Sequence, residues 1–369
     1  MQAAAPIVTG EFATKVAAYL RLASETVRAI DNVSTRIDSV GDGEHRVPVS
    51  INQSEPGNSW VCSPHTAYAR YSLEELARLR RPLLTMPLAA GCRLLGGYFW
   101  RSGLDDAVAV NNWLLSTNLY PEFDAQVVRG WLSEALDRWP GSAIWFRSLN
   151  PRYTSEWLGQ LSDMGFKLIP SRQVYLYDEI NISSRSPVNL RRDLRLLKNS
   201  AAPRSAAASW SEWDFERAAE LYALLYREKY SLLNPTYTAA FLRAWHTAGI
   251  LDLSGFRDEQ GSLRAVLGIF AAGGTMTVPI VGYDTHQPQS AGLYRLLMAA
   301  VYERAAQSRC RINLSAGAAQ FKRLRGGVGT LEYSAVYDHH LPRARRLAVS
   351  LLSLLTRSVG VPLMRRLEL

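Results

Sequence analysis

The chain has 369 residues, of which 47% are hydrophobic and 20% charged, and its formal net charge is +9. This composition excludes a wholly disordered chain, and the length predicts about two domains, each large enough for its own core. The positive charge fits either an ordinary basic surface or an anionic partner, namely a phosphorylated cofactor, an RNA or an anionic membrane.

The three cysteines, Cys62, Cys92 and Cys310, form no CxxC pair and no Cys/His group at metal spacing. We therefore expect neither a disulfide framework nor a metal site. The first twenty residues lack the basic and apolar regions of a signal peptide, and no run reaches the ~18 apolar residues of a spanning helix. These patterns predict a cytoplasmic protein without a transmembrane segment.

In the first half of the chain, apolar residues at helical spacing predict a helix over 11–30, and from Trp60 short apolar runs alternate with turns. Short β-branched runs and amphipathic stretches then alternate. They predict a strand at 107–115, a helix at 122–139, a strand at 142–149, a helix at 154–166 and a strand at 172–178.

The segment 181–208 carries a basic cluster of Arg191, Arg192, Arg195 and Lys198 before a Ser/Ala/Pro stretch, and it predicts a linker. The cluster fits either a solvated helix face or a phosphate contact. Helices at 211–230 and 235–249 follow, and then three antiparallel strands over 250–284, where turn residues separate apolar runs.

The last strand of that set opens a second series with the same order of elements as 107–178. The series is a strand at 275–283, a helix at 292–306, a strand at 311–315, a helix at 317–325 and a strand at 330–337. The repeated order predicts two copies of one α/β unit. At Gly292 a strand and a polar loop lead into a helix, an arrangement whose free N–H groups bind phosphates.

The second unit contains five motifs: KYSLLNP (229–235), PIVGYD (279–284), GLYRLL (292–297), NLSAGAAQFKRLRGG (313–327) and EYSAVYD (332–338). Together they resemble the GNAT acyltransferase superfamily, most closely its BioF2-like and Fem-type aminoacyltransferase branch. The motifs cover about 205–342, and the resemblance extends to 60–178 by element order alone. It implies an α/β (α+β) fold of two tandem GNAT-like domains, each a mixed, mainly antiparallel sheet flanked by helices.

The expected organisation has four parts. They are an N-terminal GNAT-like domain at 1–180 that walls the acceptor site, the linker at 181–208, a catalytic domain at 209–342 and an amphipathic helical tail at 343–369. The tail has arginines at both ends and is too short to span a bilayer. It is expected either to pack across the domains or to lie on an anionic membrane surface.

In GNAT-like folds two central strands splay apart, and the acyl donor enters the gap, where the backbone of the strand equivalent to 275–283 polarises the donor carbonyl. The resemblance therefore implies acyl-CoA or coenzyme A as cofactor. Its predicted contacts are Val281, Gly282, Tyr283, Gly292, Leu293, Tyr294, Arg295 and Asn313. The family's Q/R-x-x-G-x-G/A loop corresponds to 287–294 and keeps one glycine, Gly292.

The pair Phe321–Lys322 matches a Phe-Lys pair that lies at the reaction centre of Fem-type transferases. A fixed ammonium in a dry cleft stabilises developing negative charge, which makes Lys322 the first catalytic candidate. The alternative is a solvent-facing lysine in a basic helix. Asp284, His286 and Glu332 are candidate bases for the amine. The short helix lacks the tyrosine that many GNAT enzymes carry there, so Tyr333 or Tyr337 is the candidate acid.

Substrate contacts are expected from a loop past a helix, from aromatic and amide residues of the first unit and from the gap itself. These residues are Lys229, Tyr230, Asn234, Trp60, Asn112, Tyr120, Ser315 and Phe321.

Three functions follow. The first is an N-acyltransferase that moves an acyl group from a thioester, CoA- or carrier-protein-bound, to the amine of a small molecule. The second is an aminoacyl-tRNA-dependent aminoacyltransferase, for which the basic charge would suit tRNA. The third is a non-catalytic binding module on a degenerate GNAT fold.

Overall fold

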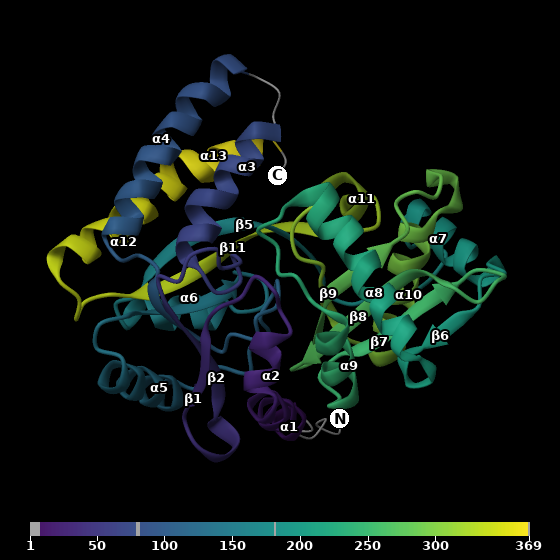
Figure 1. The fold of residues 1–369 in the computed structure, drawn as a ribbon, viewed down its shortest axis with the longest axis horizontal. Helices are drawn as coiled ribbons and strands as arrows, with labels where there is room; N and C mark the ends of the chain where they lie inside the picture. The colour runs from purple at the N-terminus through teal and green to yellow at the C-terminus, as the bar shows by residue number, and fades with distance from the viewer. Residues whose placement is uncertain (1–7, 79–81, 181, 368–369) are drawn as a thin grey trace.

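The computed structural model describes residues 8–78, 82–180 and 182–367 (Figure 1). Within them one eleven-stranded sheet runs through the whole molecule in the order β1-β2-β3-β4-β11-β5-β10-β9-β8-β7-β6. The strands are β1 (Arg36–Val40), β2 (Val47–Gln53), β3 (Asp106–Val110), β4 (Ala143–Leu149), β5 (Lys167–Tyr177), β6 (Arg204–Ala206), β7 (Asp252–Arg257), β8 (Leu263–Ala272), β9 (Thr275–Tyr283), β10 (Arg311–Asn313) and β11 (Val328–Tyr337).

Helices flank this sheet. They are α1 (Val8–Arg21), α2 (Ala23–Arg28), α3 (Tyr71–Arg78), α4 (Pro82–Arg101), α5 (Ala125–Arg138), α6 (Ser155–Asp163), α7 (Val188–Asn199), α8 (Glu212–Ala223), α9 (Ala239–Thr247), α10 (Leu293–Ser308), α11 (Ala319–Arg323), α12 (Arg343–Leu355) and α13 (Val361–Leu367). The architecture expected from the sequence is confirmed: a mixed α/β fold with a mainly antiparallel sheet between helices.

Both faces of the second half of the sheet are covered. In β8, Val266 belongs to the core cluster under α8, whereas its neighbour Leu267 belongs to the cluster under α10. Successive side chains of a strand point to opposite faces, so a strand buried on both sides reads as a continuous apolar run. That is why β8 and β9 are apolar over most of their length, with Arg264 near the start of β8 as the charged exception.

The two units share the order strand, helix, strand, helix, strand, as predicted. In the first unit it is β3-α5-β4-α6-β5, and in the second it is β9-α10-β10-α11-β11. In each unit the first two of these strands are parallel, β3 with β4 and β9 with β10, while every other named pair is antiparallel. The similar connectivity supports two copies of one fold unit.

The last strands of the units are exchanged. β11, from the end of the second unit, pairs with β4 of the first unit, and β5 of the first unit pairs with β10 of the second. β5 and β11 also pair with each other over most of their length, and this joins the two halves into one sheet. The predicted boundary at 181–208 lies on α7 and β6, and as a division of the chain it stays a prediction.

A layer of helices lies across the middle of the sheet. It contains α3, α4, α12, the π-helical turn Thr356–Gly360 and α13, and Figure 1 shows them stacked above β5 and β11. Phe99 of α4 and Leu352 of α12 share a buried cluster with Trp145 of β4 and Ile169 of β5. The sequence reading of short runs and turns after Trp60 missed α3 and α4.

The C-terminal tail is helical, as expected, but its predicted length limit is wrong. In the described part of the chain, Arg343–Arg366 is one helical stretch that is long and apolar enough to cross a membrane by length and composition, and little of it is buried. The buried residues are Ala348, Val349 and Leu352, which face the sheet. This face packs across strands contributed by both units.

Candidate acyl-transfer site

The site begins where β9 and β10 part. Their parallel pairing covers three residues and ends at Thr277 and Asn313, whereas β9 continues to Tyr283 with β8 on its other side. The main-chain groups of β9 beyond Thr277 therefore have no strand partner on the side of β10. Val278, Pro279 and Val281 line a pocket of about 1020 Å³ that opens at this gap.

The loop after β10 has an unusual backbone. Ser315, Gly317 and Ala318 have φ angles of 56°, 79° and 49°, in the left-handed region that non-glycine residues seldom adopt. Ser315 donates its backbone N–H to Asn313 Oδ1 at 2.9 Å. Such strain is retained only where the surroundings hold the chain in place.

Lys322 supplies much of that restraint. The side chain is 4% exposed, and its Nζ donates to the carbonyl oxygens of Leu314 (2.7 Å), Ser315 (3.2 Å) and Ala316 (2.8 Å). An ammonium has three N–H donors, so these three carbonyls use all of them. In this arrangement Lys322 fastens the strained loop to α11; it is not the solvent-facing lysine of the alternative reading.

The environment of Lys322 also affects its charge. Burial, and to a smaller extent the nearby Arg172 guanidinium, lower the pKa of Lys322 to about 7. The Nζ lies 5.6 Å from the centre of the Tyr175 ring, on β5. An amine with this pKa changes protonation near neutral pH, which an ordinary lysine does not.

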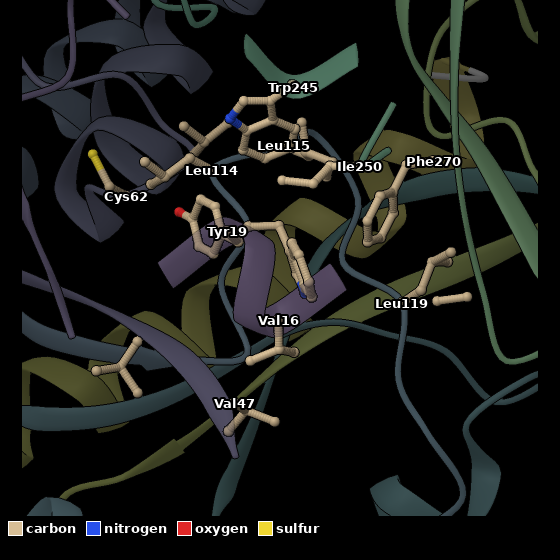
Figure 2. Close-up of a cluster of buried hydrophobic side chains, with 14 of the residues drawn as sticks. Val16, Tyr19, Val47, Cys62, Leu114, Leu115, Leu119, Trp245, Ile250 and Phe270 are labelled. Carbon is tan, nitrogen blue, oxygen red and sulfur yellow. The ribbon is translucent and has the colours of Figure 1, made fainter. Parts of the chain in front are cut away.

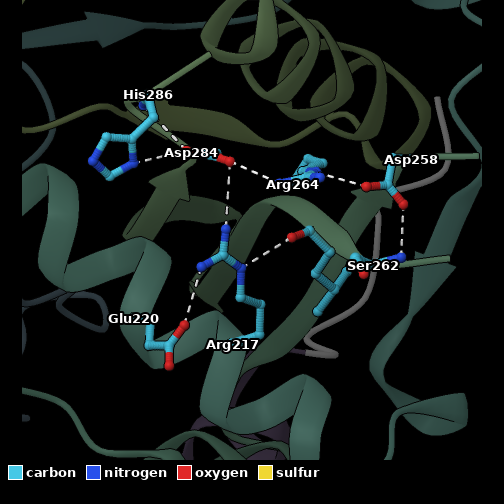
Figure 3. Close-up of polar contacts among 8 residues, drawn as sticks. Arg217, Glu220, Asp258, Ser262, Arg264, Asp284 and His286 are labelled. Atoms are coloured by element: carbon cyan, nitrogen blue, oxygen red, sulfur yellow. Dashed lines mark hydrogen bonds and ion pairs between the residues drawn. The ribbon is translucent and has the colours of Figure 1, made fainter. Parts of the chain in front are cut away.

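Asp284, at the end of β9, is held in an ionic network (Figure 3). Its carboxylate accepts from Arg264 at 2.9 Å, from Arg217 at 3.5 Å and from the backbone N–H of His286 at 3.1 Å. Burial raises the pKa of Asp284, but the hydrogen bonds from His286, Gln287 and Arg264 outweigh it and lower the pKa. A carboxylate held ionised in this way is a weak proton acceptor.

His286 and Glu332 are placed differently from each other. The His286 side chain is 79% exposed and does not line the pocket, although its Nδ1 lies 3.2 Å from Asp284. Glu332 is 2% exposed and accepts from Arg172 Nε at 2.7 Å. Its charge is therefore already paired, in a buried position outside the pocket lining.

Trp60 forms another part of the pocket wall. The guanidinium of Arg172 lies 4.9 Å from its ring and that of Arg147 lies 5.2 Å away. Its Nε1 donates to Asn234 Oδ1 at 2.9 Å, and Asn234 Nδ2 donates to Tyr226 O at 2.8 Å. Trp60 and Arg172 belong to the first unit and Asn234 to the second, so this wall is built from both.

The start of α10 faces the same pocket. Gly292 precedes the helix with φ 64°, and the first helical acceptor is its carbonyl, which takes the N–H of Leu296 at 3.0 Å. The N–H groups of Leu293, Tyr294 and Arg295 lie before that bond and have no acceptor within the helix. Such a terminus suits a phosphate group.

The pocket brings together most of the predicted site residues. Its lining includes Lys322, Asp284, Val281, Tyr283, Gly292, Leu293, Tyr294, Arg295, Lys229, Tyr230, Asn234, Trp60, Ser315 and Phe321. Tyr333 and Asn313 lie outside this lining: Tyr333 packs against the main core, and Asn313 is buried and holds the strained loop.

Gly282 also lies outside the lining, and it has a packing role. A Cβ at this position would lie 2.5 Å from the backbone of Leu221 and Tyr222, so α8 rests directly on the glycine.

The gap of the first unit is filled. β3 ends at Val110, short of the strand predicted to 115, and the following loop inserts Trp113, Leu114 and Leu115, each fully buried. Figure 2 shows Leu114 and Leu115 beside Trp245, with Tyr19 and Phe270 in the same cluster.

The two predicted contacts near this loop are structural. Asn112 is fully buried; it donates to Val61 O at 3.0 Å and accepts from Arg147 at 2.8 Å. Tyr120 donates to Arg147 O at 2.6 Å. Neither side chain lines the pocket.

The sequence reading missed one wall of the pocket. Residues of α4 and of the tail line it, among them Leu88, Cys92, Leu95, Leu355 and Leu363. The available signal was the apolar stretch from Pro82 to Trp100, in which Leu88, Cys92, Leu95 and Phe99 recur at three- and four-residue spacing.

Comparison with known proteins agrees with this geometry. A family model described as an acetyltransferase (GNAT) domain matches residues 184–323. This part of the chain is therefore similar to a GNAT acetyltransferase domain. The match contains the parting strands, the start of α10 and Lys322, while β11 follows it. No curated protein matches the chain.

Solved structures that are similar to this chain include the following three. The C-terminal domain of a putative lysylphosphatidylglycerol synthetase from Agrobacterium fabrum is 10% identical, with a TM-score of 0.48 over 68% of this chain and 82% of that one. The L-PGS of Bacillus licheniformis is 13% identical, with a TM-score of 0.47 over 67% and 82%. FemX is 10% identical, with a TM-score of 0.44 over 57% and 77%.

Proposed function

We propose that this protein is an N-acyltransferase that moves an acyl group from a thioester to the amine of a small molecule. The observation that carries the proposal is the open gap between β9 and β10 in the GNAT domain, with a pocket at its mouth. The donor is acyl-CoA or an acyl group on a carrier protein.

The residues present fit coenzyme A. The N–H groups of Leu293, Tyr294 and Arg295 would hold the pyrophosphate, and the unpaired edge of β9 would receive the pantetheine arm. When bound, the cofactor supplies the activated thioester. The protein supplies orientation, the main-chain donors of β9 and a loop fixed by Lys322, which together favour the developing negative charge on the carbonyl oxygen.

The acyl transfer requires no covalent enzyme intermediate. The neutral amine nitrogen attacks the thioester carbonyl carbon, the C–S bond breaks, and sulfur leaves as thiolate. The proton lost by nitrogen ends on sulfur, directly or through solvent. The carboxylates of Asp284 and Glu332 are already paired with arginines, so neither is assigned as the base that removes the amine proton. Trp60 and Asn234 line the pocket and are hydrogen-bonded to each other, and in this proposal they orient the amine.

Free thiol released from acyl-CoA, measured with a panel of amines, tests the proposal, with the amide product identified by mass spectrometry. Trp60→Phe keeps the ring and removes the hydrogen bond to Asn234, so we expect a higher KM for the amine and an unchanged Kd for the donor. Trp213→Phe, at a side chain that is 79% exposed, is the matched control. Donor binding without thiol release for any amine would instead indicate a non-catalytic binding module.

A second candidate, transfer from an aminoacyl-tRNA, is favoured by one feature. Arg192, Arg195 and Lys198 are exposed on α7, which packs against α10. Phosphate contacts release counterions, so tRNA binding through α7 would weaken steeply with salt. A filter-binding titration at two salt concentrations, with Arg192→Gln/Arg195→Gln, distinguishes this donor from a thioester.

The outer face of the helical layer also supports a peripheral membrane contact. Leu94 of α4 and Leu347 and Leu354 of α12 are 78%, 62% and 60% exposed, and Arg365 and Arg366 follow at the exposed end of α13. Apolar side chains next to arginines fit an anionic lipid surface. Co-sedimentation with anionic but not zwitterionic vesicles, lost in Leu347→Glu/Leu354→Glu, would support this contact.

A further inference from the structure

The pocket at the gap extends well beyond the groups needed for the reaction. From β5, where Pro170 to Gln173 form part of its lining, it continues between α3 and α4 on one side and the tail helices on the other. The lining residues of this extension, here called the helical arm, are Leu76, Pro87, Leu88, Gly91, Cys92, Leu95, Phe99, Leu352, Leu355, Val359, Gly360, Leu363 and Met364.

The helical arm is apolar, and the gap end is polar. Among the described lining residues of α3, α4, α12 and α13, the one charged side chain is Glu75. Of the other charged lining residues, Lys322, Arg325, Arg295, Asp284 and Lys229 lie at the gap end, and Arg172 lies on β5, where the arm begins. An occupant that fills both parts therefore has a polar head and a long hydrocarbon portion.

The position of the arm relative to the gap indicates which hydrocarbon this is. In the sheet β10 lies between β9 and β5, so the lining residues Pro170 to Gln173 of β5 lie on the far side of β10 from β9. An acyl chain whose carbonyl lies at the parting of β9 and β10 enters the helical arm if it extends towards β5. We infer that the helical arm holds the hydrocarbon chain of a long-chain acyl thioester; this inference rests on the function proposed above.

Gly91 offers a direct test. It lies within α4 and lines the arm, and a Cβ there would meet no atom within 4 Å. Gly91→Trp therefore places an indole in the arm without a backbone clash. Gly97→Trp is the matched control, because Gly97 lies on the same helix outside the lining and its Cβ would meet only the end of the Arg101 side chain, at 3.8 Å.

Binding is measured by calorimetry with acetyl-, hexanoyl- and decanoyl-CoA below their micelle concentrations. Each buried methylene is worth roughly a fourfold gain in affinity, so burial of even two of the eight additional methylenes should make decanoyl-CoA bind more than about tenfold more tightly than acetyl-CoA. Gly91→Trp should remove that gain and leave acetyl-CoA binding unchanged, and Gly97→Trp should retain the full dependence on chain length.

Cys92 gives a second readout that needs no variant. Cys92 is half-buried and lines the arm. Cys310 is half-buried too but lies outside the pocket, and Cys62 is buried. Burial raises the pKa of the Cys92 thiol, so alkylation is run at mildly alkaline pH. Decanoyl-CoA should slow the alkylation of Cys92 and leave Cys310 unaffected, and acetyl-CoA should slow neither.

The outcomes separate this inference from the function on which it rests. Decanoyl-CoA that binds more tightly and protects Cys92, without amide formation, supports the arm and overturns the transferase proposal. Amide formation with equal affinity for all three chain lengths and no protection of Cys92 overturns the arm. Protection of Cys92 by a phospholipid vesicle but not by decanoyl-CoA also overturns it, since the chain would then belong to a lipid.

Discussion

Replacing Lys322 with methionine tests the physical state of the residue that fixes the strained loop. Burial and Arg172 lower the pKa of Lys322 from 10.5 to about 7 in the folded chain, while the unfolded chain keeps the ordinary value. Between these two pKa values the unfolded state binds one more proton than the folded state. Stability should therefore rise with pH in this window, and Lys322 should contribute no pH dependence below pH ~7.

The size of the effect follows from the shift. One pKa unit corresponds to about 1.4 kcal/mol, so the free energy of unfolding should gain about 3 kcal/mol from Lys322 between roughly pH 7.5 and 9.5. Lys322→Met keeps the length of the side chain, removes the titrating amine and leaves the carbonyls of Leu314, Ser315 and Ala316 without their donor. The variant loses both the cost of burying the amine and its three hydrogen bonds, so the test does not depend on its overall stability. The test is the slope of unfolding free energy against pH, which should be flatter in Lys322→Met than in the wild type.

Urea unfolding of the wild type and of Lys322→Met at both pH values measures the difference in slope. Other titrating groups cancel in the comparison, and Lys229→Met, at an exposed lysine, should keep the wild-type slope. If Lys322→Met shows the same slope as the wild type, the three carbonyls hold Lys322 protonated throughout. Charge on this residue would then be constant near neutral pH, and the reasoning from burial would be refuted.

Three further substitutions test the packing and charges around the site. Gly282→Ala should lower the free energy of unfolding by more than about 2 kcal/mol, because the added Cβ would lie 2.5 Å from the backbone of α8. Gly159→Ala is the control: its Cβ would meet nothing within 4 Å, so it should be neutral or stabilising, and equal effects of the two substitutions would contradict the close approach. Glu332→Gln leaves the partly buried Arg172 without its charge partner and should lower stability in urea by about 2–4 kcal/mol. A loss below about 1 kcal/mol would mean that the pair is effectively solvated. Asp284→Asn should destabilise the protein at neutral pH. Because the pKa of Asp284 in the folded chain lies below the usual 3.8, the difference in melting temperature between wild type and variant should shrink as pH falls through that lower pKa. A difference that does not change with pH would contradict an ionised Asp284.

The repeated element order was readable from sequence because periodicity changes sharply at each boundary. β9 occupies the predicted 275–283, and the helix predicted from Gly292 begins one residue later with Gly292 as its cap. Local signals of this kind do not report which strands become neighbours. β5 and β11 have ordinary strand patterns, and their exchange between the units depends on long-range pairing that no local pattern encodes.

The candidate site divides in the same way. Lys322 and Ser315 were found because residues of a recognisable motif lie close together in the chain. The role of Lys322 was not predictable, because its three acceptors are carbonyl groups of the backbone, which every residue carries. For Asn112 the sequence predicts a substrate contact, and the structure shows its side chain donating to Val61 and accepting from Arg147. A polar side chain in a loop at a strand end suits either role, and the local pattern does not distinguish them.

The two units have the same element order, but only the gap between the parallel strands of the second unit is open. The loops that follow β3 and β9 differ in their side chains, and this accounts for the difference. After β3, Trp113 inserts beside Tyr19 and Phe270, at ring distances of 5.2 and 4.9 Å, and closes the first gap with core side chains. After β9 the chain turns through polar residues, and the second gap opens into the pocket. Because β5 is exchanged, Arg172 and Gln173 of the first unit line that pocket. The first unit thus contributes a wall to the open gap of the second, and neither unit alone contains the whole site.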